Sequence, residues 1–441
     1  MPGDPIKHVV VLMFENHSFD QMLGACAGVD GADPARFNAD STGQRYFQTE
    51  AEPSAVDPDP MHETDHVLRQ LAGGNRGFVS EYEREYANTQ TPATPEKRQK
   101  IMNCFRRDSL PALHALAENF TVCDNWFSSV PGPTWANRFF VHSGTSLGRV
   151  QMPDNLSHPL LYLGYIQDTI YERLNAGGIS WRIYFGDLPQ SIVLMQQWKE
   201  ENRRNYRPME QFYIDAARLE PDFPAYTFIE PRYYDPLHLE GPQNDDHPPH
   251  LPGPAQELLA AVYNSLRRNE PLWNSTLLVV LYDEHGGFYD HLPTPPAEAP
   301  DPFNFDNFDF KQLGVRVPAV LASPWVKKGV LSTPFDHTSL LRYLIDKWGL
   351  GRLTKRSDVA TSILEAILDA PRADTPASLP MPPLPRVALA VAPLPLNEHQ
   401  KALLEFTKLL GPVLPLGVQP LTAEPMNELA AAKRRVAAFL Q

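Results

Sequence analysis

Acidic and amide side chains follow two strand-like hydrophobic segments of this sequence, directly after each segment ends. Glu15 and Asn16 follow the first segment, and Asp283 and Glu284 follow a second segment far along the chain. If both segments are parallel strands of one sheet, these side chains meet where the carboxyl ends of the strands lie. Carboxylates gathered in this way repel each other unless a cation lies between them, so the pattern predicts a hard divalent metal with oxygen ligands. The alternative is that Glu15 and Asp283 are only helix caps or surface ion pairs.

A hydroxyl group that could act as a nucleophile lies in a rigid turn before a helix-like segment. The turn reads Val130-Pro131-Gly132-Pro133-Thr134, and Asn137 follows it. Proline and glycine fix such a turn, and the free N–H groups at the start of the next helix attract an anion. Since a threonine hydroxyl is a weak nucleophile, a metal bound to the Thr134 oxygen would activate it. The alternative is that Thr134 only caps the helix.

Two histidines lie in proline-rich loops that could hold them rigidly. His247 precedes two prolines, and His62 follows the segment Asp57-Pro58-Asp59-Pro60-Met61. A histidine in a rigid loop suits general acid catalysis or contact with a phosphoryl oxygen. We therefore expect His247 to protonate a leaving group and His62 to lean over the site, with ordinary solvated side chains as the alternative. The pattern assigns no role to three further histidines, His285, His291 and His337.

The elements that must position these residues are short β-branched segments that alternate with periodic, helix-like segments. The predicted strands are 6–13, 120–126, 179–185, 225–230, 275–282 and 315–322. The predicted helices are 109–119, with Ser109 as the cap, 168–176, 254–268, 337–348, 358–368, 397–410 and 422–440. Most strands lack strict polar–apolar alternation, which is typical of strands covered on both faces. The predicted fold is therefore α/β, a mainly parallel sheet with helices on both faces.

Two regions interrupt this alternation. Residues 33–98 are polar, rich in proline and aspartate and without a strong period, which predicts an irregular cap insertion over the sheet. Residues 371–395 are so rich in proline that they exclude an uninterrupted helix or a central strand, so we expect them to run extended along the surface. The predicted organisation is a catalytic domain over 1–370, with its cap insertion near 33–98, and a proline-rich wrap with C-terminal helices over 371–441.

The composition excludes several classes of protein. The chain has 441 residues, with 39 Lys or Arg against 53 Asp or Glu and a net charge of −14. This acidic balance provides no basic stripe for nucleic acid, and the 45 prolines, about twice the usual share, exclude an all-helical bundle. The sequence contains no apolar run long enough to span a membrane and no recognisable signal peptide. We therefore expect a cytoplasmic protein, or one exported by a signal-peptide-independent route, of open oligomeric state. The cysteines are expected to be free thiols, with a Cys104–Cys123 disulfide as the alternative.

Taken together, six segments resemble, in order, the motifs of the bacterial phosphoesterase family of phospholipases C and acid phosphatases, within the alkaline phosphatase superfamily. They begin at Glu15, Gly132, Ile229, Asn244, Asp283 and Asp336 and lie within a resemblance that runs from about Ile6 to Leu350. The resemblance implies an alkaline phosphatase-like sheet and one or more divalent metal ions. The residues it implies are Thr134, His247 and His62 as catalytic groups, Glu15, Asn16, Thr134, Asp283 and Glu284 as metal ligands, and Asn137 as a substrate-binding residue. One departure is Ala136, where the family commonly has proline.

The predicted function is a metal-dependent hydrolase of phosphoric esters that cleaves phosphodiesters like a phospholipase C, through Thr134. The expected substrate is a phosphoester, with a phospholipid as one candidate, and the expected metal is calcium, magnesium, manganese or zinc. An acid phosphatase acting on monoesters is the alternative, and a non-enzymatic scaffold on the same fold is a remote one. A sulfatase is disfavoured because threonine cannot become formylglycine.

Overall fold

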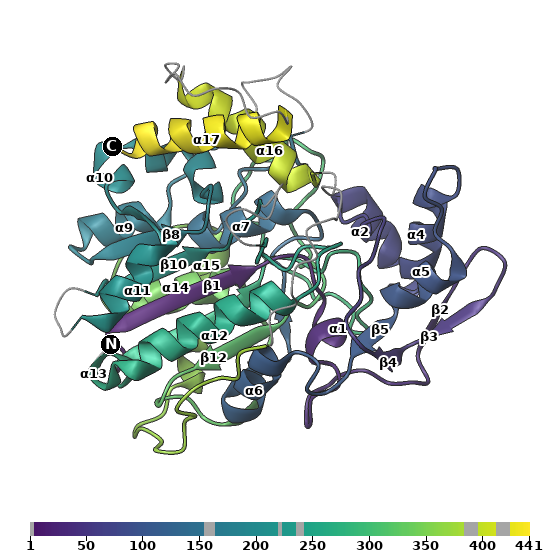
Figure 1. Ribbon diagram of the computed structural model, residues 1–441, viewed down its shortest axis with the longest axis horizontal. Helices are drawn as coiled ribbons and strands as arrows, with labels where there is room; N and C mark the ends of the chain where they lie inside the picture. Colours follow the sequence, from purple (N-terminus) through teal and green to yellow (C-terminus); the bar gives the residue numbers. More distant parts are fainter. Residues whose placement is uncertain (1–3, 154–163, 219–222, 235–241, 383–395, 412–423) are drawn as a thin grey trace.

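Figure 1 shows the computed structural model of the protein, which describes residues 4–153, 164–218, 223–234, 242–382, 396–411 and 424–441. Its centre is an eight-stranded sheet with the strand order β13-β6-β12-β11-β1-β10-β8-β9. The strands are β1 His8–Phe14, β6 Thr121–Cys123, β8 Trp181–Phe185, β9 Tyr206–Pro208, β10 Tyr226–Glu230, β11 Thr276–Tyr282, β12 Ala319–Ala322 and β13 Gly329–Leu331. Only β12 runs antiparallel to its neighbours, β11 and β6. The predicted mainly parallel sheet is confirmed.

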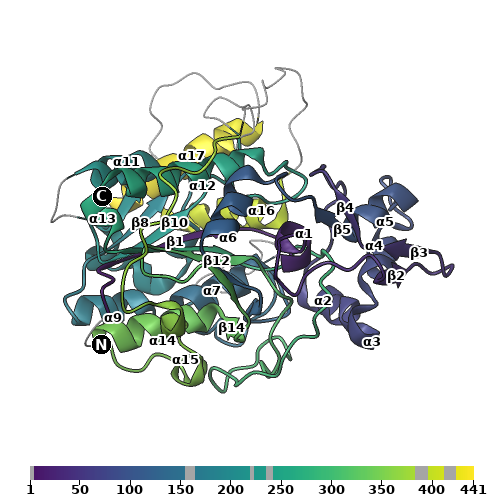
Figure 2. The same cartoon turned by 90° about the horizontal axis from the view of Figure 1, so that it is seen from below.

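Helices cover both faces of this sheet, as predicted (Figure 2). One face carries α6 (Pro111–Asn119), α11 (Met209–Ala217) and α12 (Gly253–Arg268), and the other carries α7 (Thr134–Ser143), α9 (Ile170–Ala176) and α14 (His337–Trp348). Every residue of β1 and of β11 is buried. Because both faces pack against helices, these strands require apolar side chains at successive positions rather than at every second one.

The cap insertion lies beyond the carboxyl ends of the central strands (Figure 1) and is more regular than predicted. It contains strands β2 Phe37–Ala39, β3 Arg45–Phe47 and β4 Thr49–Ala51, and helices α2 Thr64–Gln70, α3 Ala72–Asn75, α4 Phe78–Tyr86 and α5 Pro95–Ile101. Strand β4 pairs with β5 (Asn103–Phe105), which closes the insertion. Its helices have at most nine residues, so the 3.6-residue period has too few turns to appear in the sequence.

One strand and one helix in the C-terminal half of the chain differ from the prediction. The predicted strand 315–322 is shortened to β12, because Pro318 has no N–H to donate to a ladder. The predicted helix 358–368 is wrong: α15 (Lys355–Val359) ends there, and a separate 3₁₀ turn, η3 (Ile363–Ala366), follows. Between them Ala360 is extended, and the Ser362 hydroxyl caps the 3₁₀ turn instead of continuing the helix.

The start of α6 also differs from the prediction. Ser109 is not its cap, because the Ser109 hydroxyl donates to the Arg106 carbonyl at 2.6 Å. Leu110 takes the cap position, and Pro111 occupies the first turn. A proline is well accommodated there since the first N–H groups of a helix have no helical partner.

The chain ends in two helices, α16 (Glu398–Thr407) and α17 (Glu424–Leu440). Of the proline-rich segment only residues 371–382 are described, and 383–395 lie outside the described residues. Leu403 and Phe406 of α16 are buried in the main hydrophobic core. This helix therefore packs into the core of the region predicted as the catalytic domain.

Two further predictions concern a disulfide bond and membrane-spanning helices. Cys104 and Cys123 are both buried and free, so the alternative of a disulfide between them is wrong. In the part of the chain that the structure describes, every helix is too short or too polar to cross a membrane.

Candidate active site

The ends of β1 and β11 bring the four predicted carboxylate and amide ligands together. These strands are parallel neighbours in which Phe14 lies opposite Tyr282, so Glu15 and Asp283 follow at the same edge. The Asn16 backbone N–H donates to Oδ1 of Asp283 at 3.1 Å. All four side chains, including Glu284, are fully buried. The predicted convergence of these residues is confirmed, and they are neither exposed nor helix caps.

Close backbone approach holds this edge in shape. Asn16 has a left-handed φ of 61°, a conformation that asparagine tolerates better than most residues. Gly286 lies against it with a φ of 62°, and a Cβ atom there would stand 2.1 Å from the Asn16 carbonyl oxygen. The Gly286 N–H in turn donates to Oε2 of Glu284 at 2.7 Å. The Gly-Gly pair after β11 therefore lets Glu284 turn back towards Asn16.

The buried carboxyl groups have strongly perturbed protonation. Burial, more than any other influence, raises the pKa of Glu15 well above its usual value; Arg138 lowers it, and Asp283 raises it further. Burial likewise raises the pKa of Glu284 to about 8, with His62 opposing and Asp283 adding to the shift. Among the residues that the structure describes, both carboxylate oxygens of Glu15 and Oε1 of Glu284 are buried without a hydrogen-bond partner. A divalent cation fits this donor set, because it would occupy the unsatisfied oxygens and neutralise their repulsion.

Arg138 is a site residue to which the sequence pattern assigned no role. Its guanidinium is buried, with Nη2 3.1 Å from Oε1 of Glu15 and Nε 3.1 Å from Oδ2 of Asp283. It follows Thr134 by four residues on α7, so both side chains lie on the same face of that helix. That spacing is the signal that could have identified it. Arg138 already supplies one positive charge between two of the carboxylates.

Thr134 is the first residue of α7, at the carboxyl edge of the sheet. Its hydroxyl donates to Oδ1 of Asn16 at 3.4 Å, which places it beside the carboxylate cluster. Pro133 takes the cap position and Thr134 makes no capping hydrogen bond, so the alternative of a capping threonine is wrong. The Asn137 amide donates to the Gly132 carbonyl at 2.8 Å, and its oxygen accepts from the Val130 N–H at 3.0 Å. These contacts make Asn137 a brace for the turn, and its role in substrate binding stays a prediction.

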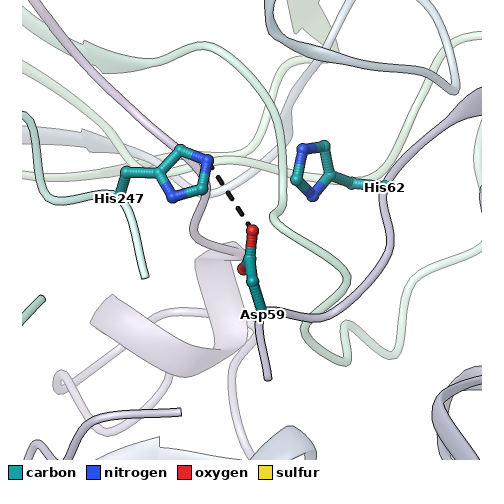
Figure 3. A group of neighbouring side chains, drawn as sticks. All are labelled: Asp59, His62 and His247. Carbon is teal, nitrogen blue, oxygen red and sulfur yellow. Dashed lines mark ion pairs between the residues drawn. The ribbon is translucent and has the colours of Figure 1, made fainter. Parts of the chain in front are cut away.

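His62 and His247 face each other across the site, from the cap and from the loop after β10 (Figure 3). Their ring centroids are 5.8 Å apart. The Nδ1–H of His62 donates to the Pro60 carbonyl at 2.9 Å, which leaves Nε2 to accept from the Asn16 amide at 3.3 Å. Nε2 of His247 lies 3.8 Å from Oδ2 of Asp59, a cap residue that sequence reasoning did not assign. Asp59 and His62 come from the cap and His247 from the loop after β10, and Nε2 of His62 reaches the carboxylate cluster, 3.9 Å from Oε1 of Glu284.

The two histidines differ in their affinity for a proton. Burial opposes the charge on His62, but Glu284 and Glu398 outweigh it, so the pKa of His62 is raised. Burial and the neighbouring His62 lower the pKa of His247 well below its usual value. Of the two rings, His62 therefore binds a proton more readily than His247.

Of the three histidines without a predicted role, two support the site from outside and one lies in a separate cluster. Nε2 of His285 pairs with Oε1 of Gln70 at 2.8 Å, which ties the loop after β11 to the cap. The Nε2–H of His337 donates to the Asp283 carbonyl at 2.7 Å. His291 belongs to a separate buried ion cluster with Asp20, where Nδ1 lies 2.9 Å from Oδ2.

A histidine from the C-terminal helix α16 also reaches the site. The Trp135 indole N–H donates to Nδ1 of His399 at 3.0 Å, and Nε2 of this buried ring lies 3.8 Å from Oε1 of Glu15. A lone histidine on an amphipathic helix carries no sequence pattern that indicates such a place.

The chain is similar to a known protein family and to several known proteins. A model of the Phosphoesterase family matches residues 6–351. Over 433 residues the chain is 36% identical to non-specific phospholipase C6 of Arabidopsis thaliana, covering 91% of this chain and 79% of that protein. Over 391 residues it is 27% identical to non-hemolytic phospholipase C of Pseudomonas aeruginosa, covering 78% of this chain and 54% of that protein. A solved alkaline phosphatase superfamily protein from Vibrio parahaemolyticus is 10% identical, with a TM-score of 0.34 over 80% of this chain and 67% of that one.

Proposed function

Since the chain belongs to the Phosphoesterase family and is a hydrolase of phosphoric esters, we propose that it cleaves phosphodiesters as a phospholipase C, with Thr134 as nucleophile. The observation that carries the proposal is the place of the Thr134 hydroxyl, 3.4 Å from Oδ1 of Asn16 at the edge that gathers the buried carboxylates. The order of the six motifs further supports a place in the alkaline phosphatase superfamily.

The residues that would hold a divalent cation are Glu15, Asn16, Asp283 and Glu284, together with the Thr134 oxygen. When bound, such a cation supplies positive charge for the phosphoryl oxygens and lowers the pKa of the Thr134 hydroxyl. The unsatisfied oxygens of Glu15 and Glu284 support this assignment. Oxygen ligands favour calcium, magnesium or manganese, and the nearby histidines are also compatible with zinc.

The protein's own groups would divide the reaction between them. Thr134 attacks phosphorus in line, and the bond to the leaving alcohol oxygen breaks as the threonine ester forms. The proton that Thr134 loses passes to the His62–His247 pair, this pair gives a proton to the leaving oxygen, and water then releases the phosphoryl group from Thr134. Arg138 holds Glu15 and Asp283 in position from behind through its two ion pairs.

Two relatives named as phospholipases C favour a phospholipid diester as the substrate. A monoester phosphatase is the second candidate, because the same nucleophile and acid would serve it. Side-by-side rates on a phosphatidylcholine dispersion and on an aryl phosphate monoester separate the two. A non-enzymatic scaffold would show neither rate, although a scaffold has no need to keep a nucleophile, an acid pair and buried carboxylates together.

The decisive test of the nucleophile is Thr134→Ala. We expect it to lower kcat on a phosphodiester by at least about a thousandfold, with binding of Mn²⁺ to the metal-free protein retained by the four other ligands. Thr134→Ser, which keeps a hydroxyl, should retain measurable turnover. Near-wild-type kcat in Thr134→Ala would refute the assignment.

A further inference from the structure

The C-terminal helix α16 brings His399 to the back of the candidate active site. The ring is buried and packs 4.5 Å from the ring of Tyr233. Its Nε2 atom points towards Glu15, 3.8 Å from Oε1, and has no hydrogen-bond partner among the described residues. A buried polar atom without a partner is costly, so its direction towards an unsatisfied carboxylate requires an explanation.

The hydrogen bond from Trp135 defines which ring nitrogen of His399 carries the proton. An indole N–H can only donate, so Nδ1 of His399 must be an acceptor. A neutral imidazole then carries its proton on Nε2, the atom that faces Glu15. With a proton on Nε2, His399 is a hydrogen-bond donor to the carboxylate and not itself a ligand of a cation.

The start of α16 is held firmly enough to fix this ring. Asn397 and Gln400 form a reciprocal capping box, with each backbone N–H donating to the other side chain at 2.8 Å. The Gln400 amide also donates to the Tyr233 carbonyl, and the Tyr234 hydroxyl donates to the Gln400 carbonyl at 2.5 Å. His399 lies between these two anchors, so the loop after β10 determines its position.

We propose that His399 is a positioning residue that donates from Nε2 to Oε1 of Glu15 and thereby orients this carboxylate for the divalent cation. The inference rests on the proposed function, in which Glu15 is a ligand. The distance of 3.8 Å between Nε2 and Oε1 is about 0.8 Å longer than a hydrogen bond. Rotation about the last side-chain bond of Glu15 can close this gap.

The arrangement leaves one oxygen of Glu15 free. Among the described residues, Arg138 and His399 both approach Oε1, at 3.1 and 3.8 Å, whereas neither an ion pair nor a hydrogen bond involves Oε2. Two donors on one oxygen fix the plane of the carboxylate and direct the other oxygen to the cation. Donors of this kind behind metal ligands typically change metal affinity or activity by about 10- to 100-fold when they are removed.

Two substitutions of His399 separate donation from packing. His399→Asn keeps a polar atom near the Nδ1 position for Trp135 but loses the donor at Nε2, whereas His399→Gln places an N–H near the Nε2 position. The matched control is His142→Asn. His142 is also buried, its Nδ1 atom lies 3.0 Å from the Tyr171 hydroxyl, and within the described part of the chain its Nε2 atom has no hydrogen-bond partner. His142 lies at the far end of α7 from Thr134.

The primary measurement is titration calorimetry of Mn²⁺ into the full-length, metal-free protein, with urea unfolding as a check of folding. We expect His399→Asn to weaken Mn²⁺ binding by about 10- to 100-fold, His399→Gln to recover most of the loss, and His142→Asn to bind like wild type. Wild-type affinity in His399→Asn would overturn the proposal, and so would a His399→Gln protein as weak as His399→Asn.

A second measurement does not depend on a folded asparagine variant. The ¹⁵N shifts of histidine-labelled wild-type protein, assigned by the peak that His399→Gln removes, report the tautomer of His399. An Nε2–H tautomer supports the inference, and an Nδ1–H tautomer overturns it.

Glu15→Gln distinguishes failure of this inference from failure of the proposed function. If Glu15→Gln loses Mn²⁺ binding while His399→Asn keeps it, only the role of His399 is wrong. If Glu15→Gln binds Mn²⁺ and turns over a phosphodiester like wild type, Glu15 is not a ligand and both proposals are overturned.

Discussion

Replacing Arg138 with methionine removes the buried positive charge that lies between Glu15 and Asp283. Each of these carboxylates is 3.1 Å from the guanidinium, and all three side chains are fully buried. Removing one partner of a buried ion pair costs about 3–5 kcal/mol, because the remaining charge must stay unpaired or take up a proton. With a urea slope of roughly 3 kcal/mol per M, the unfolding midpoint of the metal-free protein should fall by about 1 to 2 M.

The cation site makes a second part of this prediction specific. If Glu15 and Asp283 bind a divalent cation, saturating Mn²⁺ supplies the charge that methionine removed, so it should raise the midpoint of Arg138→Met more than that of wild type. The matched control is Arg316→Met, which breaks an equally buried pair of contacts, 2.8 Å to Asp20 and 2.9 Å to Asp290. Arg316→Met should lose similar stability, and Mn²⁺ should raise its midpoint only as much as that of wild type.

The assay is urea unfolding of the three proteins, followed by tryptophan fluorescence, in EDTA and in millimolar Mn²⁺. A metal-free Arg138→Met protein as stable as wild type would refute the reasoning about the buried pairs. An equal gain from Mn²⁺ in both arginine variants would refute the assignment of Glu15 and Asp283 to the cation site.

Two further predictions concern the same edge of the sheet. Burial raises the pKa of Glu284 from 4.5 to about 8, so the folded, metal-free protein keeps a proton that the unfolded chain has lost. The free energy of unfolding should therefore fall as the pH rises from about 4.5 to 8, as urea unfolding in EDTA can measure. Glu284→Gln should flatten this fall, and an unchanged slope would contradict the assignment. Gly286→Ala should weaken Mn²⁺ binding, because its Cβ would stand 2.1 Å from the Asn16 carbonyl oxygen. Gly349→Ala, at a nearly equal φ of 63° and with no described atom within 4 Å of its Cβ, should leave binding unchanged, and equal losses would show that φ strain alone is responsible.

The part of the site that follows the central strands could be predicted from the sequence. Glu15 and Asp283 directly follow buried strands, and parallel register brings such residues to one edge whatever the loops do. The position of Thr134 was equally predictable, because a Pro/Gly turn before a helix leaves few conformations for the hydroxyl. In these cases a local pattern determines the position.

The remaining site residues depend on packing between distant segments. The contact of His399 with Glu15 exists only because α16 packs into the core beside Trp135, and no spacing in the sequence encodes this docking. Asp59 reaches His247 from the cap in the same way. The cap helices were missed because they are too short for the 3.6-residue period to appear. The break after α15 was missed because the Ser362 hydroxyl caps the turn that follows it.

The central position of β1 has a consequence for the synthesis of the protein. This strand is the first element of the chain, yet both of its neighbours, β10 and β11, begin only at Tyr226 and Thr276. At ordinary translation rates, the His8–Phe14 segment is synthesised roughly ten to forty seconds before β10, the first of its two partner strands. During this interval an unpaired hydrophobic strand is exposed to self-association, so production of the protein should depend strongly on chaperones and on temperature.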